Sequence, residues 1–138
     1  MFRATRDIKR KFDSKEIKYR VVDKSDVSYI EAGIRGDNYS SMDVLYISRD
    51  DDNDVSVRVM QICKVPDNKL APMILAVNEC NNKFRYVKFV MDKDRDINLE
   101  YDMPLKNNDV GEIAVELLIR IMKIMDEAYP IFMKAMYA

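Results

Sequence analysis

Two acidic turns hold the side chains whose types and spacing come closest to a metal-binding site. Asp92, Asp94 and Asp96 match the first three ligand positions of a calcium-binding loop. The sixth position of such a loop needs a glycine and the twelfth a bidentate glutamate, but here these positions hold isoleucine and methionine. A second acidic run, residues 50–54, also lacks a ligand spacing. We therefore interpret both runs as polar turns and predict no cofactor. The sequence leaves open whether Asp92, Asp94 and Asp96 bind a cation.

Residue types that support common catalytic chemistry are scarce in the chain. It has no histidine, which removes serine–histidine and cysteine–histidine catalysis and histidine-ligated metals. Two cysteines cannot form a four-thiolate zinc site, and three scattered glycines cannot build a phosphate-binding loop. Glu79 stands among three asparagines, which most simply end a helix and bond to neighbouring backbone. We predict that the protein is not an enzyme. Catalysis by carboxylates alone is the enzymatic alternative.

Neither secretion nor a membrane span is indicated. No long apolar run follows the basic residues near the start, and charged residues interrupt every apolar stretch before it reaches about 18 residues. Cys63 and Cys80 form no CxxC motif, so we expect two free thiols rather than a disulfide. These features predict a cytoplasmic protein without a membrane partner.

Positive charge is concentrated near the start of the chain. Residues 1–24 contain nine Lys or Arg and four Asp or Glu, which gives +5, whereas the whole chain has a net charge of −1. Such a segment is either a solvated helix face or a surface for nucleic acid or an acidic partner. Beyond its first positions only Phe12 and Tyr19 are aromatic, too few for a base-stacking surface. We predict a solvated helix face and no nucleic-acid partner.

The elements that position these side chains follow from the period of the apolar residues. In the first half, a helical period predicts a helix at 5–18. A period of two predicts three strands, at 27–34, at 44–48 and from residue 55 to the junction at residues 65–66, with a fourth, shorter strand at 19–22 as an option. One face of the first of these strands is formed by Ser28, Ile30, Ala32 and Ile34.

The second half of the chain predicts a helix, a hairpin and a last helix. The middle helix follows the junction at residues 65–66 and ends near Asn82. Strands at 84–91 and 97–103 flank an acidic turn, and the strict alternation of the second means that one of its faces is buried. The elements together predict an α+β fold with helices on an antiparallel five-stranded sheet, in the order helix, three strands, helix, two strands, helix.

The last helix is expected over residues 110–129. Asn108 or Asp109 caps its start, and Pro130 stops or kinks it before a second short helical piece. One apolar face of this helix contains Ala114, Leu117, Ile121, Ile124 and Ala128. Because a sheet covers only one side of a helix, a second apolar face predicts another burying surface, most simply a second copy of the chain. The residues predicted to form this dimer or partner interface are Leu118, Met122, Met125, Tyr129 and Met133.

Three stretches of the second half resemble the YbjN family of bacterial sensory transduction regulators. They are a helix that ends in an Asn-x-x-Asn pair, a Lys-Phe strand before an acidic turn, and a strand end with the sequence Tyr-Asp-Met-Pro-Leu, at residues 74–81, 87–92 and 99–105. The resemblance covers nearly the whole chain, more loosely before residue 40. It implies a single YbjN-like domain over residues 1–138 and a fold similar to that of the type III secretion chaperones, often dimeric.

The same resemblance implies no catalytic residues, because the family has none established. Its members usually place a glycine in the hairpin turn, where this chain has Arg95 and Asp96. We predict a non-enzymatic module that binds a protein partner of unknown identity, acting as a homodimeric regulator or chaperone-like adaptor. It would present a hydrophobic groove or an exposed strand edge. The alternative is a regulatory domain that senses a small ligand in an apolar pocket.

Overall fold

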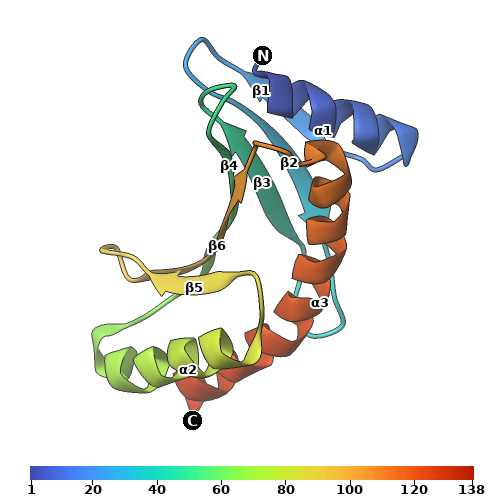
Figure 1. The fold of residues 1–138 in the computed structure, drawn as a ribbon. Helices are drawn as coiled ribbons and strands as arrows, with labels where there is room; N and C mark the ends of the chain where they lie inside the picture. Colours follow the sequence, from blue (N-terminus) through green and yellow to red (C-terminus); the bar gives the residue numbers. More distant parts are fainter.

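An antiparallel sheet of six strands forms the centre of the computed structural model, which describes residues 1–138 (Figure 1). The strands are β1 (Arg20–Asp23), β2 (Ser28–Ile34), β3 (Met42–Ser48), β4 (Asp54–Lys64), β5 (Lys88–Met91) and β6 (Asp96–Pro104). Neighbours in the sheet follow the order β1-β2-β3-β4-β6-β5. The predicted α+β class is confirmed, but the predicted count of five strands is wrong, because residues 20–23 pair with β2 and add a sixth.

Three α-helices pack against this sheet, namely α1 (Arg3–Ser14), α2 (Leu70–Lys83) and α3 (Val110–Tyr137). A short 3₁₀ turn, η1 (Asp67–Lys69), leads into α2, so that Pro72 lies in the first helical turn, where proline is tolerated. The long helix α3 runs from α1 at its beginning to α2 at its end (Figure 1). The same helix therefore packs against both α1 and α2.

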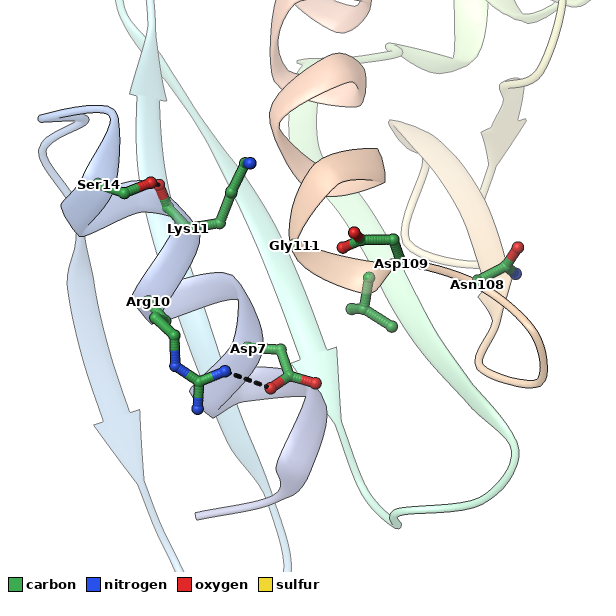
Figure 2. A pocket seen from close by; sticks show the side chains of 8 residues that line it. Asp7, Arg10, Lys11, Ser14, Asn108, Asp109 and Gly111 are labelled. Carbon is green, nitrogen blue, oxygen red and sulfur yellow. Dashed lines mark hydrogen bonds and ion pairs between the residues drawn. The ribbon is translucent and has the colours of Figure 1, made fainter.

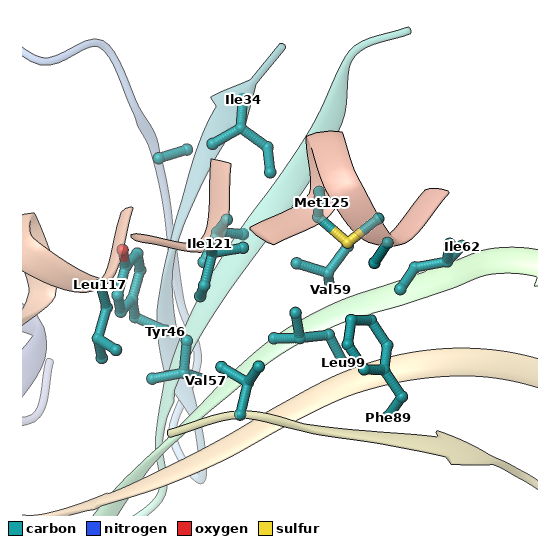
Figure 3. Close-up of a cluster of buried hydrophobic side chains, with 14 of the residues drawn as sticks. Ile34, Tyr46, Val57, Val59, Ile62, Phe89, Leu99, Leu117, Ile121 and Met125 are labelled. Carbon is teal, nitrogen blue, oxygen red and sulfur yellow. The ribbon is translucent and has the colours of Figure 1, made fainter. Parts of the chain in front are cut away.

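The core lies between the sheet and the helices. The predicted buried face of β2 is confirmed, since Ser28, Ile30, Ala32 and Ile34 are all buried. Figure 3 shows side chains from the central strands gathered against Ile121 and Met125 of α3. The hydroxyl of Tyr46 donates a hydrogen bond of 2.8 Å to the carbonyl of Ala114, so this large buried side chain has no unpaired polar atom.

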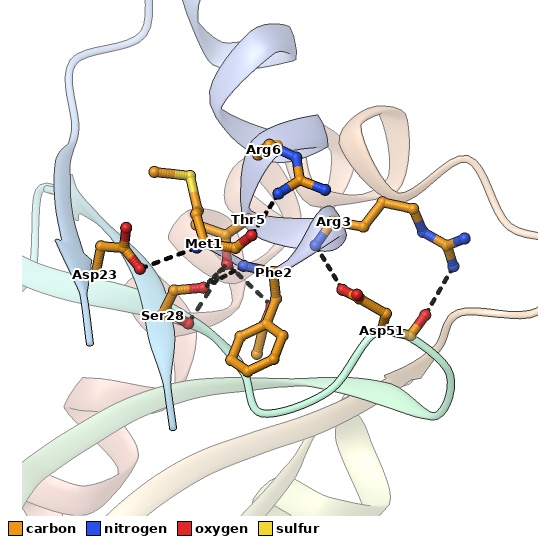
Figure 4. Close-up of polar contacts among 9 residues, drawn as sticks. Met1, Phe2, Arg3, Thr5, Arg6, Asp23, Ser28 and Asp51 are labelled. Atoms are coloured by element: carbon orange, nitrogen blue, oxygen red, sulfur yellow. Dashed lines mark hydrogen bonds and ion pairs between the residues drawn. The ribbon is translucent and has the colours of Figure 1, made fainter. Parts of the chain in front are cut away.

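A cluster of buried hydroxyl groups joins α1 to the sheet (Figure 4). The Thr5 hydroxyl lies 2.7 Å from that of Ser28 and donates to the Ser48 hydroxyl at 3.1 Å. The N–H of Phe2 also donates to Ser28. Three small polar residues can therefore be wholly buried, because each hydroxyl has a partner.

β4 agrees with the predicted strand, which begins at Val55 and is ended by Val65 and Pro66. Its pairing with β6 shifts register between Val59 and Cys63, where Gln61 adopts a φ of 55°. The N–H of Gln61 donates to the Asn98 side chain at 2.7 Å. This irregularity breaks the alternation of Val55, Val57 and Val59, but the strand continues to Lys64. β5, in contrast, begins four residues later than predicted, after Tyr86 turns the chain with a φ of 74°.

α1 ends earlier than predicted, at Ser14 rather than at residue 18. Glu16 takes a left-handed φ of 58°, and the N–H of Ile17 bonds back to the carbonyl of Phe12 at 2.9 Å. This closing turn is typical of a helix C-terminus. Apolar residues after it pack at the margin of the core from an irregular segment, which a helical period does not distinguish from a further turn.

α3 continues through Pro130, so the alternative in which this proline stops the helix is wrong, and a kink there stays a prediction. Its start is as predicted for one of the two candidates, because the Asp109 side chain accepts the N–H of Glu112 at 3.1 Å. Proline removes the bond to the carbonyl four residues earlier, that of Asp126. Here Asn38 donates its side-chain amide to this carbonyl at 3.0 Å, which compensates for the missing bond.

Candidate functional site

The predicted interface on α3 lies mostly inside the molecule. Met125 is wholly buried in the core, so its assignment to an interface with a second chain is wrong. Leu118, Met122, Tyr129 and Met133 are half-buried and pack against the core from its margin. Their exposed portions stay a predicted contact surface.

Part of this α3 face is covered by the chain itself, through the β2–β3 loop (residues 35–41). The Tyr39 hydroxyl donates to the carbonyl of Met122 at 3.2 Å, and its ring lies 6.4 Å from that of Tyr129. Burial raises the pKa of Tyr39 to about 12, with the nearby Asp126 carboxylate as a second cause, so the hydroxyl stays protonated and remains a donor. A second copy of the chain is not needed to cover this part of the helix.

The most exposed aliphatic side chains lie instead on α2. Leu75 is 70% exposed and Ile74 is 53% exposed, although both are in a helix that packs against the core. Leu75 lines a groove of about 400 Å³ between α2 and the end of α3, which we call the α2–α3 groove, whereas Ile74 lies outside its lining. Its lining residues are Pro72, Leu75, Ala76, Glu79, Ile131, Lys134, Ala135 and Ala138. This is the strongest candidate for a protein-binding surface in the structure.

Sequence reasoning missed this surface. The buried side of α2 is formed by Met73, Ala76 and Cys80, and Ile74 and Leu75 lie off that side. The signal was the same one that singled out α3, namely more apolar positions than one helix face can bury. This excess indicates an exposed surface only once the structure shows that no other element covers Ile74 and Leu75.

Both charged residues of the groove, Glu79 and Lys134, lie outside every ion pair of the chain. At the opposite end of the helix pair, Lys83 and Glu127 approach to 3.8 Å. An incoming surface therefore meets an apolar groove with one free charge of each sign.

Asn81, a member of the Asn-x-x-Asn pair, has a structural role at the outer edge of the sheet. Its side-chain oxygen accepts the N–H of Phe89 at 2.7 Å, and its amide donates to the Phe89 carbonyl at 3.0 Å. β5 is an outer strand, so these two backbone groups would otherwise face solvent. The side chain thereby occupies the position of a neighbouring strand.

The two acidic turns use their carboxylates as hydrogen-bond acceptors. Asp92 accepts the Asp94 and Asp96 N–H groups at 2.9 and 3.0 Å and the Asn98 amide at 2.9 Å. These bonds, with that of Asn98 as the largest, lower the pKa of Asp92. Arg95, where the family usually has glycine, adopts a φ of 66°, and the turn keeps the left-handed conformation that glycine favours.

Asp50 organises the other turn in the same way. Its carboxylate accepts the N–H groups of Asp52 and Asn53 at 2.9 and 2.7 Å, which lowers its pKa. No group of three or more acidic or cysteine side chains is arranged to hold a metal ion. The geometry thus assigns both turns a structural role.

The cysteines are free thiols in low-polarity surroundings. Burial raises the pKa of Cys63 and of Cys80 to about 11, and the nearby charges of Asp96 and Glu79 act in the same direction. Both thiols are therefore protonated at neutral pH, which makes them poor nucleophiles and poor metal ligands.

Most of the basic side chains near the start of the chain have partners within it. The guanidinium of Arg3 donates to the main-chain carbonyl of Asp51 at 2.8 Å, and the guanidinium of Arg10 lies 3.3 Å from Asp7 (Figures 2 and 4). Figure 2 also shows the polar hollow between α1 and α3, a depression of about 430 Å³. Lys11, on its rim, pairs with Glu112 at 3.0 Å. Pairing of this kind weakens the field that α1 presents to an anionic partner, whereas Lys18 and Lys24, which follow α1, form no ion pair.

The five main surface hollows all open to solvent, and none encloses a volume in which a small molecule would be buried. No helix combines the length and the apolar character needed to cross a bilayer.

Comparison with known structures supports the fold. The crystal structure of YbjN from E. coli has a TM-score of 0.52 with 16% identity, and the match covers 87% of each chain. A chain of the heterodimeric ExoU–SpcU complex from the type III secretion system of Pseudomonas aeruginosa has a TM-score of 0.48 with 14% identity, over 78% of this chain and 83% of that chain. No curated protein matches the sequence.

Comparison with family models agrees with the motifs identified above. The YbjN model, described as “Putative bacterial sensory transduction regulator”, matches residues 7–129. The matched range includes the Asn-x-x-Asn pair, the acidic turn and the strand end of the resemblance, and it extends over most of the chain. The chain therefore belongs to the YbjN family.

Proposed function

We propose that this protein is a non-enzymatic regulatory adaptor that binds other proteins and acts as a homodimer. The observation that carries the proposal is the α2–α3 groove with its exposed side chain Leu75. Exposed apolar residues that gather beside a groove are typical of protein–protein contacts. The regulatory description of the family supports the same class of function.

A second copy of the chain is the occupant that best fits the groove. The surface carries both a hollow and a protruding side chain, Leu75, so each copy can place its Leu75 against the hollow of the other. Glu79 and Lys134 add one unpaired charge of each sign, which a two-fold contact can pair between copies. Such self-complementarity is what an isologous dimer requires.

A regulatory rather than a catalytic role agrees with the chemistry of the side chains. In the acidic turns, the carboxylates of Asp50 and Asp92 accept hydrogen bonds from backbone N–H groups. Both thiols are protonated at neutral pH. Free, partly buried thiols also suit a reducing compartment, so we place the protein in the cytoplasm. The open hollows do not favour the alternative of a small-ligand sensor.

Analytical ultracentrifugation of the wild-type protein and of two variants tests the dimer. We expect the wild type to sediment as a dimer at micromolar concentration and Leu75→Asp as a monomer. Leu75 is mostly exposed, so the substitution leaves the core intact, which circular dichroism can check. The matched control is Ile119→Asp, since Ile119 is also exposed (46%) on α3 but lies away from the groove.

A wild-type protein that stays monomeric at about 100 μM would overturn the homodimer. A Leu75→Asp variant that remains dimeric would place the interface elsewhere. Exchanging the two charges tests whether Glu79 and Lys134 pair between copies. We expect Glu79→Lys to weaken the dimer and the added Lys134→Glu to restore it.

A further inference from the structure

The sheet has two outer strands, and their free edges differ. β5 forms one edge, where Asn81 occupies both backbone groups of Phe89. β1 forms the other edge, and no backbone N–H or carbonyl on its outer side is bonded; the Asp23 carboxylate forms an ion pair with the N-terminal ammonium at 3.2 Å. An edge of this kind can accept a further strand from another polypeptide.

The hairpin geometry shows which groups of β1 face outward. The N–H of Lys24 donates to the carbonyl of Val27 at 2.8 Å, at the turn between β1 and β2. Hydrogen-bonded and non-bonded positions alternate along an antiparallel pair, so Val22 and Arg20 bond to β2. The N–H and carbonyl groups of Val21 and Asp23 therefore point away from β2 and are available to a partner.

The side chains around this edge define what would fit. Tyr19 and Val21 are half-buried at the margin of the core, so an added strand gains apolar contacts if it is apolar at the position beside them. Residues 15–24 contain four Lys or Arg and two Asp or Glu, a net charge of +2. Lys18 and Lys24, one on each side of β1, are exposed and form no ion pair within the chain.

We infer that the β1 edge binds an extended, acidic segment of a protein partner as a seventh strand. Its backbone pairs with Val21 and Asp23, alternate apolar side chains cover the core margin, and its carboxylates meet Lys18 and Lys24. A second copy of β1 is a poor occupant, because it would bring the same basic residues together. The inference rests on the proposed protein-binding function and specifies the kind of segment bound, at a site separate from the α2–α3 groove.

A synthetic peptide with the sequence Glu-Val-Thr-Val-Thr-Val-Glu is a suitable probe. We expect its binding, followed by NMR, to slow the amide hydrogen exchange of Val21 and Asp23 by about tenfold or more and to leave that of Phe89 unchanged. The control peptide carries lysines in place of both glutamates and should bind several-fold more weakly. Added salt should reduce this difference.

Two substitutions at one position separate backbone pairing from side-chain contact. Val21→Pro removes the outward N–H without removing a bond to β2, and it should weaken peptide binding by about tenfold or more. Val21→Thr keeps the N–H and should bind as the wild type does. If the proline variant misfolds, the amide exchange of Val21 and Asp23 in the wild-type protein still shows whether the peptide pairs with the β1 edge.

Three results would overturn the inference: no binding of the acidic peptide at about 1 mM, binding without protection of Val21 and Asp23, or equal binding by Val21→Pro. Leu75→Asp should bind the peptide as the wild type does, because the two surfaces are separate. If the protein is a dimer but does not bind the peptide, only the β1 edge site is refuted. If the protein is a monomer and binds the peptide, only the homodimer is refuted.

Discussion

The side-chain amide of Asn38 donates to the main-chain carbonyl of Asp126, which is the carbonyl that Pro130 leaves without an intrahelical donor. The N–H of Asn38 also donates to the Asp126 carboxylate at 2.8 Å. Two residues 88 positions apart thus hold the β2–β3 loop on α3 at the one turn of the helix that lacks its own bond. The contact explains both the continuity of α3 and the covering of its second apolar face.

The first prediction concerns this contact. Asn38→Ala should lower the free energy of unfolding by about 1 kcal/mol, because the Asp126 carbonyl then loses its donor. In a Pro130→Ala background the loss should be smaller, since alanine supplies the missing helical N–H. Urea unfolding of the two single variants and the double variant measures this coupling. Equal losses in both backgrounds would show that Asn38 does not act through the carbonyl.

The crossing of α1 and α3 should depend on Gly111. A Cβ atom at this position would lie 2.8 Å from the Lys11 Cβ and 2.9 Å from the Asp7 carbonyl oxygen. Gly→Ala in a helix normally stabilises by about 1 kcal/mol, but here the helices must move apart, and we expect a loss of roughly 1–3 kcal/mol. Thermal unfolding measures it. Gly33→Ala is the control, because its nearest neighbour would lie 3.8 Å away, and it should be close to neutral.

The bonds from Asn81 to β5 should contribute measurably to stability. Asn81→Ala removes two hydrogen bonds to Phe89 and should lower the free energy of unfolding by roughly 1–2 kcal/mol. It should also speed the amide exchange of Phe89. Asn82→Ala serves as the control, because its exposed amide bonds only within α2, and its effect should stay within about 0.5 kcal/mol. Similar losses in both variants would contradict a specific role for Asn81.

The acidic turn at Asp92 should make stability depend on pH. Its pKa is lowered in the folded chain, so its contribution is complete above the unfolded value of about 3.9 and disappears as the pH falls through the lower, folded value. Asp92→Asn should therefore be less stable than the wild type at pH 7, and the difference should shrink toward pH 3. Urea unfolding at both values measures the gap. A gap of the same size at both pH values would mean that the carboxylate charge is not responsible.

Local patterns predicted the elements that carry strong local signals. The face of Ser28, Ile30 and Ala32 and the capping by Asp109 follow from periodicity and side-chain chemistry within a few residues. β1 was only an option because four residues carry little pattern, and its existence depends on pairing with β2. The register shift within β4 left no signal in the period of two, because it belongs to the pairing with β6.

The candidate site was less accessible to sequence reasoning than the fold. Periodicity detected that α3 has more apolar surface than one sheet can cover, but it assigned the second face to another copy of the chain. In the structure, Tyr39 contacts part of that face and Met125 lies in the core. On α2, the same excess leaves Ile74 and Leu75 exposed.

The sequence alone determined the order of helices and strands, the inward-facing residues of the strands and the membership in a family, because these depend on neighbouring residues and on short motifs. Only the tertiary structure decided which apolar faces are covered, that Pro130 lies within a continuous helix, and that Asn81 blocks one edge of the sheet while β1 leaves the other open. The physical reason is that these outcomes depend on contacts between distant segments, such as Asn38 with Asp126, and a local period contains no information about which distant segment supplies the missing partner.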